Sequence, residues 1–128
     1  MPVRFNNIYT DKIKFRNMFE AYKRASKGKK QNKEVILFEL DLACNLLSIL
    51  RDLYNDKYYF SNYRKFKIYD PKEREILSLP FRDRVVHQWY VEEFIKPVYM
   101  DIFIKDTYAC IEGRGLHLAI YNFNAIMY

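Results

Sequence analysis

Glycine, proline, cysteine and histidine are all scarce in this 128-residue chain, which has 3 Gly, 4 Pro, 2 Cys and 2 His. So little Gly and Pro excludes a low-complexity linker. Cys44 and Cys110 lie far apart without a second Cys or His at ligand spacing, which argues against zinc. We expect both thiols to be buried. A disulfide between them stays open, although no export signal favours one.

Long apolar runs are also missing. No run approaches the roughly 20 residues that span a bilayer, and no basic segment followed by an apolar one opens the chain as a signal peptide would. We therefore expect a cytoplasmic protein that does not contact a membrane.

What the chain does have is aromatic residues and positive charge. Aromatics make up 18% of the residues and the formal net charge is +6, in a length that fits one domain spanning 1–128. Residues 1–34 hold ten of the 22 Lys and Arg but only three of the 16 acids, so the excess charge lies there. Its centre around Gly28 includes Lys27, Lys29 and Lys30. Such a patch favours phosphate backbones, although a solvated helix end has the same composition.

The apolar spacing predicts an α+β fold, mostly helical with a short antiparallel β-hairpin of two or three strands. We expect helices over 15–27, 33–54, 81–95 and 116–128, with Gly28 ending the first. Two apolar rows on 33–54 predict a helix packed on two sides, and its polar stripe, which includes Asp41, Asn45 and Asp52, predicts a solvated face. Pro97 is expected to end or kink the helix over 81–95.

The chain stops inside the apolar periodicity of 116–128, with no polar tail. We infer either a truncated chain or a last helix that packs on something else. A second copy of the chain is one such partner, so a homodimer through this helix is expected as one possibility.

Standard catalytic motifs are absent: there is no Gly-rich phosphate loop, no HExxH and no nucleophile elbow. His87 follows Asp83 by one helical turn, an arrangement that can orient an imidazole, but no nucleophile accompanies it. A helix-capping or core-facing histidine is therefore the favoured interpretation. We predict no catalytic residue and no metal ligand in this chain.

The predicted hairpin is rich in cations interleaved with aromatic residues. Alternation places Arg64, Phe66 and Ile68 on one face and Lys65, Lys67 and Tyr69 on the other. Such a ribbon can bind phosphates and stack bases. The alternative is an edge hairpin that its charges protect from aggregation.

These residues also carry a family resemblance. Residues 66–76 and 79–87 read FKIYDPKEREI and LPFRDRVVH, and residues 103–110 and 113–119 read FIKDTYAC and GRGLHLA. The opening adds AYKRASKGK at 21–29, then Phe38 and Glu39. In this order the segments resemble the fingers region of bacterial reverse transcriptases. The nearest pattern is that of diversity-generating retroelements, with retrons and group II introns further off. The family commonly has a basic residue after the Ala-Cys pair, where this chain has Ile111.

The resemblance implies an N-terminal fingers region that grips RNA template, RNA/DNA duplex and incoming dNTP. In that family a Lys and an Arg of the hairpin bind the triphosphate, and here they would be Lys72 and Arg74. Arg82 and Arg84 would lie near the template or in the base of the fingers, although Arg84 can equally pair with Glu92 or Asp83. Gly113, Arg114 and Gly115 would let the backbone approach template phosphates. The nucleic-acid contacts expected from all these arguments are Arg64, Lys65, Lys67, Arg82, Gly113, Arg114, Gly115, Lys27, Lys29 and Lys30.

The palm aspartates that would hold two Mg²⁺ in such a polymerase would lie beyond residue 128. We therefore expect no cofactor on this chain, Mg²⁺ on the full-length polymerase, a missing palm domain as a partner, and no DNA synthesis by this chain alone. Two other hypotheses stay open: a standalone RNA- or DNA-binding module left by a retroelement, and a structural protein that associates through its apolar carboxyl end.

Overall fold

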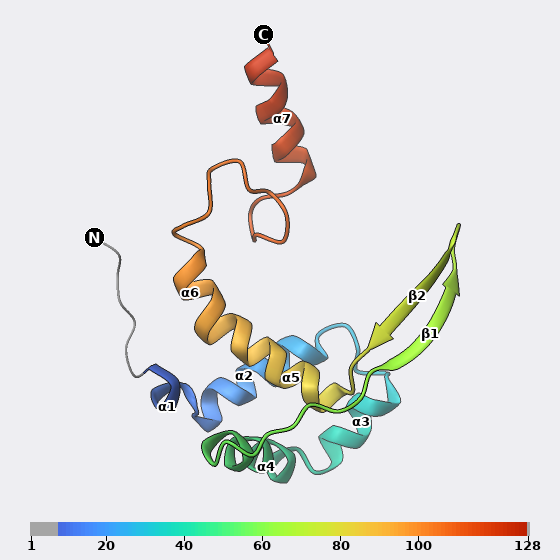
Figure 1. The fold of residues 1–128 in the computed structure, drawn as a ribbon, viewed down its shortest axis with the longest axis vertical. Coiled ribbons are helices and arrows are strands. Elements are labelled where there is room, and N and C mark those ends of the chain that lie inside the picture. The colour runs from blue at the N-terminus through green and yellow to red at the C-terminus, as the bar shows by residue number, and fades with distance from the viewer. Residues whose placement is uncertain (1–7, 128) are drawn as a thin grey trace. The chain divides into compact units, whose positions relative to one another are not determined.

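The computed structural model describes residues 8–127 (Figure 1). It is α+β: mainly helical, with one two-stranded antiparallel hairpin between the described helices, as the sequence predicts. The elements in order are α1 (Ile8–Lys12), α2 (Phe15–Ser26), α3 (Lys33–Leu40), α4 (Leu42–Tyr54), β1 (Arg64–Tyr69), β2 (Glu73–Ser78), α5 (Phe81–Tyr90), the π-helix η1 (Val91–Ile95), α6 (Lys96–Tyr99) and α7 (Leu116–Met127). No helix between residues 8 and 127 is long and apolar enough to cross a membrane.

The chain divides into two compact units, Met1–Ile95 and Lys96–Tyr128. Within its described residues, the first holds α1 to η1 with the hairpin, and the second holds α6, a loop and α7. The expectation of one domain over 1–128 stays a prediction. The end of the last predicted helix, Tyr128, lies outside the described residues.

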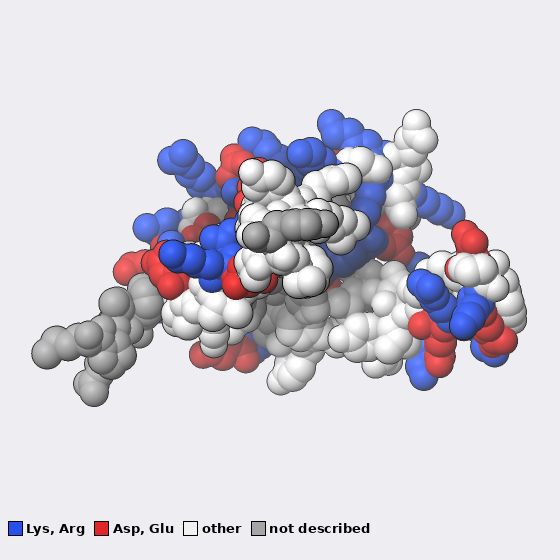
Figure 2. Space-filling model, turned by 90° about the horizontal axis from the view of Figure 1, so that it is seen from above, with Lys and Arg blue, Asp and Glu red and all other residues white. Residues whose placement is uncertain are grey.

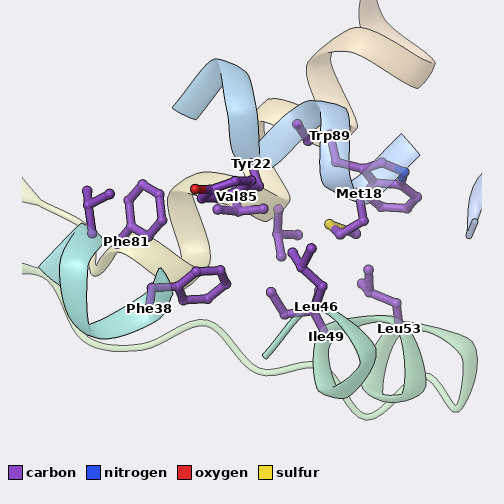
Figure 3. Close-up of a cluster of buried hydrophobic side chains, with 12 residues drawn as sticks. Met18, Tyr22, Phe38, Leu46, Ile49, Leu53, Phe81, Val85 and Trp89 are labelled. Atoms are coloured by element: carbon purple, nitrogen blue, oxygen red, sulfur yellow. The ribbon is translucent and has the colours of Figure 1, made fainter. Parts of the chain in front are cut away.

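The core of the first unit is a cluster of apolar side chains from α2, α3, α4 and α5 (Figure 3). Met18, Leu46 and Trp89 are among its fully buried members. The Trp89 indole Nε1 donates a hydrogen bond to the Lys12 carbonyl at 3.1 Å, so the one polar atom of this ring is satisfied. Helix α5 therefore shares one apolar core with α2, α3 and α4. It begins three residues after the last residue of β2, so the hairpin leads directly into this core.

The helix predicted over 33–54 is broken at Asp41, whose φ and ψ are −127° and 42°. In a continuous helix the Phe38 carbonyl would accept from the amide of Leu42. Here the side-chain amide of Asn45 donates to that carbonyl at 3.0 Å, which is the local competition that Asn side chains offer to a helix. The prediction of one long helix was wrong for this reason.

Only one of the two apolar rows on α3 and α4 is packed. Val35, Leu46 and Ile49 are fully buried, whereas Leu40 and Tyr54 of the other row are 76% and 70% exposed. The prediction of a helix packed on two sides was therefore wrong. Periodicity shows which residues share a row, but not whether another element covers that row.

The predicted end of the first helix and the predicted start of the helix at residue 81 agree with the structure to within one residue. Helix α2 ends at Ser26, and Gly28 follows with φ +72°, the left-handed conformation that glycine adopts without a Cβ penalty. Helix α5 starts after Pro80 and turns into the π-helix η1 before Pro97, then continues to Tyr99. The widened turn precedes a proline that has no N–H to donate, and helices commonly deform at such positions.

Candidate nucleic-acid interface

The hairpin projects from the helices of the first unit as a two-stranded ribbon (Figure 1). Its strands pair Phe66 with Ile76 and Ile68 with Arg74. Lys72 lies in the turn between the strands, and both Lys72 and Arg74 are exposed. The turn sequence Asp70-Pro71 supplies the fixed φ and short polar side chain that a tight reversal needs. Of the two cations predicted to bind triphosphate, Lys72 therefore lies in the turn and Arg74 lies in the adjoining end of β2.

The two other lysines of the hairpin are paired with acids on the opposite strand. Lys65 lies 3.6 Å from a carboxylate oxygen of Glu75, and Lys67 is paired with Glu73. In Figure 2 the hairpin, on the right, accordingly shows blue and red side chains next to each other. Exposed pairs of this kind contribute little to stability. They do reduce the positive charge that this face offers to a phosphate.

No ion pair within residues 8–127 includes Lys72 or Arg74. The acids next to them along the chain, Glu73 and Glu75, are paired with Lys67 and Lys65. The tip thus has two cations whose charge no described carboxylate neutralises by direct contact. This arrangement suits an anion with several charged oxygens.

At its base the hairpin is joined to the helices through Glu34 at the start of α3. One oxygen of this carboxylate accepts from Arg64 of β1 at 2.5 Å, and the other accepts from Arg84 of α5 at 2.8 Å. Arg84 therefore pairs neither with Glu92 nor with Asp83, the two partners weighed from the sequence. Its buried Nε has no hydrogen-bond partner in the described part of the chain. Three elements, β1, α3 and α5, thus meet at this carboxylate at the base of the hairpin.

Arg82 of α5 is likewise hydrogen-bonded to side chains of another helix, α4. Its Nη2 donates to Asp52 at 2.7 Å and to the Ser48 hydroxyl at 3.3 Å, and its guanidinium lies over the Tyr58 ring, 5.1 Å from the centroid. The polar stripe of α4, predicted to be solvated, is thus partly a contact surface for α5. These three contacts fix the Arg82 guanidinium between α4 and the Tyr58 ring. Arg82 therefore has a structural role in addition to the predicted template contact.

Asp83 is fully buried and acts as the acceptor for the loop that follows α4. Its carboxylate accepts from the Tyr58 hydroxyl at 2.5 Å and from the Ser61 amide at 2.9 Å. His87 is exposed, with its ring 5.1 Å from that of Phe60. The prediction of a core-facing histidine was wrong, because His87 is exposed. The hydrogen bonds of the Asp83 carboxylate go to Tyr58 and Ser61 rather than to His87.

The buried Tyr58–Asp83 bond predicts a loss of stability at alkaline pH. Burial and then the hydrogen bond to Asp83 raise the pKa of Tyr58 above its usual value of 10.0. The unfolded chain therefore loses this proton at a lower pH than the folded one, so the stabilisation is complete below pH 10 and falls as pH rises further. We expect Tyr58→Phe to reduce the fall in the urea midpoint between pH 9 and pH 11. The exposed Tyr59→Phe is the control, and equal falls in both variants would contradict the expectation.

The basic turn after α2 lies against α5. Lys27 and Lys29 line a pocket of about 270 Å³ together with Arg84 and His87. Lys30, although exposed, is not part of this pocket. The structure thus brings two of the three predicted lysines next to α5.

The second unit holds Gly113, Arg114 and Gly115. Gly113 has φ +76°, and the Gly115 carbonyl accepts the first hydrogen bond of α7 from Ala119 at 3.0 Å. Arg114 donates through Nη1 to the carbonyls of Lys105 and Thr107, both at 3.3 Å, so its guanidinium closes the loop before α7. Ile111, at the position where the resembled family commonly has a basic residue, is buried.

Neither thiol is buried: Cys44 and Cys110 are both free and exposed, so the prediction of buried cysteines was wrong. Cys44 lies on the uncovered side of α4, which explains the difference. Among residues 8–127, no group of three or more His, Cys, Asp or Glu is placed to hold a metal ion.

A scan against protein-family models finds no match for this chain, and a search of curated proteins finds no relative. The resemblance to reverse transcriptases therefore rests on the sequence motifs quoted above.

Sequence reasoning missed two groups of residues. The contacts of Glu34 and Asp83 were not predicted, because each of these carboxylates binds residues that are far away in the sequence. The rings of Tyr58 and Phe60 were not singled out from the sequence, although both line a pocket in the folded chain.

Proposed function

We propose that this chain is the N-terminal fingers region of an RNA-directed DNA polymerase, which grips the RNA template and the incoming dNTP in the cytoplasm. The observation that carries the proposal is the hairpin tip, where Lys72 and Arg74 are exposed and free of described ion pairs. A triphosphate with its metal ions needs cations that fold over it. A projecting two-stranded ribbon that carries two such cations supplies that part.

The second unit supports the proposal through the apolar surface of α7. No residue of this helix is buried, and Phe123, Ile126 and Met127 are 62%, 77% and 67% exposed. Apolar surface of this extent typically marks an interaction site. In the proposed polymerase the palm domain would cover it. Pairing of two copies through α7 is the alternative that the same surface allows.

We expect no DNA synthesis by the 128-residue chain alone, because the aspartates that would hold the two catalytic Mg²⁺ belong to the palm. The test is primer extension on an RNA template with dNTPs and Mg²⁺ or Mn²⁺. The expected result is no template-dependent product together with salt-sensitive binding of the same primer–template. Template-dependent product would show that the catalytic residues lie within this chain. Absence of salt-sensitive binding would favour the structural-protein hypothesis.

A further inference from the structure

Two pockets on the helices of the first unit share a residue of α5 and contain no residue of the hairpin. The first is a pocket of about 490 Å³ between α5 and the loop after α4. The rings that line it include Tyr58, Phe60, His87 and Tyr90. Phe60 and Tyr90 are 55% and 50% exposed, so they present ring surface to solvent. A pocket of this size, lined mainly by apolar and aromatic residues, suits a flat ring of the size of a nucleobase.

The second is the basic pocket on the neighbouring face of α5. Two of its cations are engaged: Arg24 lies 3.7 Å from Glu92, and Arg84 is held by Glu34. Lys27 and Lys29 have no ion pair within residues 8–127 and are exposed. The pocket therefore keeps a positive charge that suits a phosphate group.

The two pockets meet at His87, which lines both. The acidic residue Asp56 is also among the described lining residues of the aromatic pocket. A negative charge there repels phosphate, whereas the lysines at the other end attract it. A ligand with a flat apolar ring and a phosphate therefore has one favoured orientation across His87.

We propose that this junction binds one nucleotide of a single-stranded nucleic acid, with its base in the aromatic pocket and its phosphate at Lys27 and Lys29. A base inside a duplex is stacked on its neighbours and cannot enter such a pocket, so the site selects single strands. The inference does not rest on the hairpin, which contributes no residue to either pocket.

Trp89 provides a direct readout, because it is the only tryptophan of the chain and lines the aromatic pocket. The experiment titrates the 128-residue chain with a single-stranded oligouridine and follows indole fluorescence. An abasic oligomer with the same number of phosphates is the ligand control. We expect oligouridine to change the Trp89 emission saturably, and the abasic oligomer to bind more weakly and leave the emission unchanged. Equal binding and equal emission changes with both ligands would overturn the placement of a base in the pocket.

Two pairs of variants test the two halves. Phe60→Leu removes a stacking ring and is expected to weaken oligouridine binding about tenfold, whereas Tyr59→Leu, which changes an 83% exposed ring outside the pocket, leaves it unchanged. The double variant Lys27→Glu and Lys29→Glu is expected to weaken binding and its salt dependence more than Lys14→Glu with Lys105→Glu does. Wild-type affinity in Phe60→Leu would overturn the proposal. Charge reversal at Lys72 and Arg74 leaves the Trp89 response intact, so this site and the proposed hairpin function are tested separately.

Discussion

Charge reversal at the hairpin tip, with Lys72→Glu and Arg74→Glu together, is expected to weaken binding of a fluorescent dNTP about 100-fold in the presence of Mg²⁺. Each charge-assisted contact to phosphate is worth about tenfold in affinity or more, and the double variant removes two. Both side chains are exposed and make no ion pair in the described chain, so the change breaks no ion pair there. Fluorescence anisotropy measures the affinity directly.

The matched control is Lys14→Glu with Lys105→Glu, which changes the net charge of the chain by the same amount at exposed positions. We expect this control to lose far less affinity, since long-range attraction alone is screened at physiological salt. Equal losses in the two double variants would show that the nucleotide responds only to net charge. Unchanged affinity in the hairpin variant would remove Lys72 and Arg74 from the site.

Removal of the buried carboxylate by Asp83→Ala is expected to lower the free energy of unfolding by about 3 kcal/mol, since each hydrogen bond to a charged group contributes roughly 1.5–3 kcal/mol. The variant leaves the Tyr58 hydroxyl and the Ser61 amide without their acceptor. Domains of this size are stable by only about 5–15 kcal/mol, so the loss is a large fraction of the total. Urea unfolding followed by circular dichroism measures it.

Asp101→Ala is the control for Asp83→Ala, because Asp101 is exposed. Tyr58→Phe removes one of the two hydrogen bonds and is expected to cost less than Asp83→Ala. If Asp83→Ala unfolds within about 0.5 kcal/mol of wild type, the range typical of surface substitutions, then the carboxylate does not hold the loop after α4 in place.

The elements that the sequence predicted well are those fixed by local chemistry. Gly28 ends α2 because of its left-handed φ, Pro80 precedes α5, and the Asp70-Pro71 turn separates two alternating strands. Each of these depends on residues within a few positions of one another, so the pattern carries enough information.

The errors concern which surfaces other elements cover. The row with Leu40 and Tyr54 repeats as regularly as the row with Val35 and Leu46, yet only the second is buried. Burial of the cysteines was misjudged for the same reason. Composition cannot show which apolar row or thiol a distant element will reach.

The candidate site likewise has residues that could be predicted from the sequence and contacts that could not. The tip cations Lys72 and Arg74 were proposed from the resemblance to reverse transcriptases, which is carried by a continuous stretch of the sequence. The carboxylate of Glu34, which accepts from Arg64 and Arg84, joins residues 30 and 50 positions away. No spacing rule connects such residues, so this contact at the base of the hairpin became visible only in the folded chain.

The most direct test of the proposed function is to read the native coding sequence that follows the codon for Tyr128. The proposal predicts that it continues into a palm domain with the catalytic aspartates, including an aromatic residue followed by Asp-Asp after one intervening position. A stop codon directly after Tyr128 would contradict the polymerase assignment and leave a nucleic-acid-binding module as the remaining function for the hairpin.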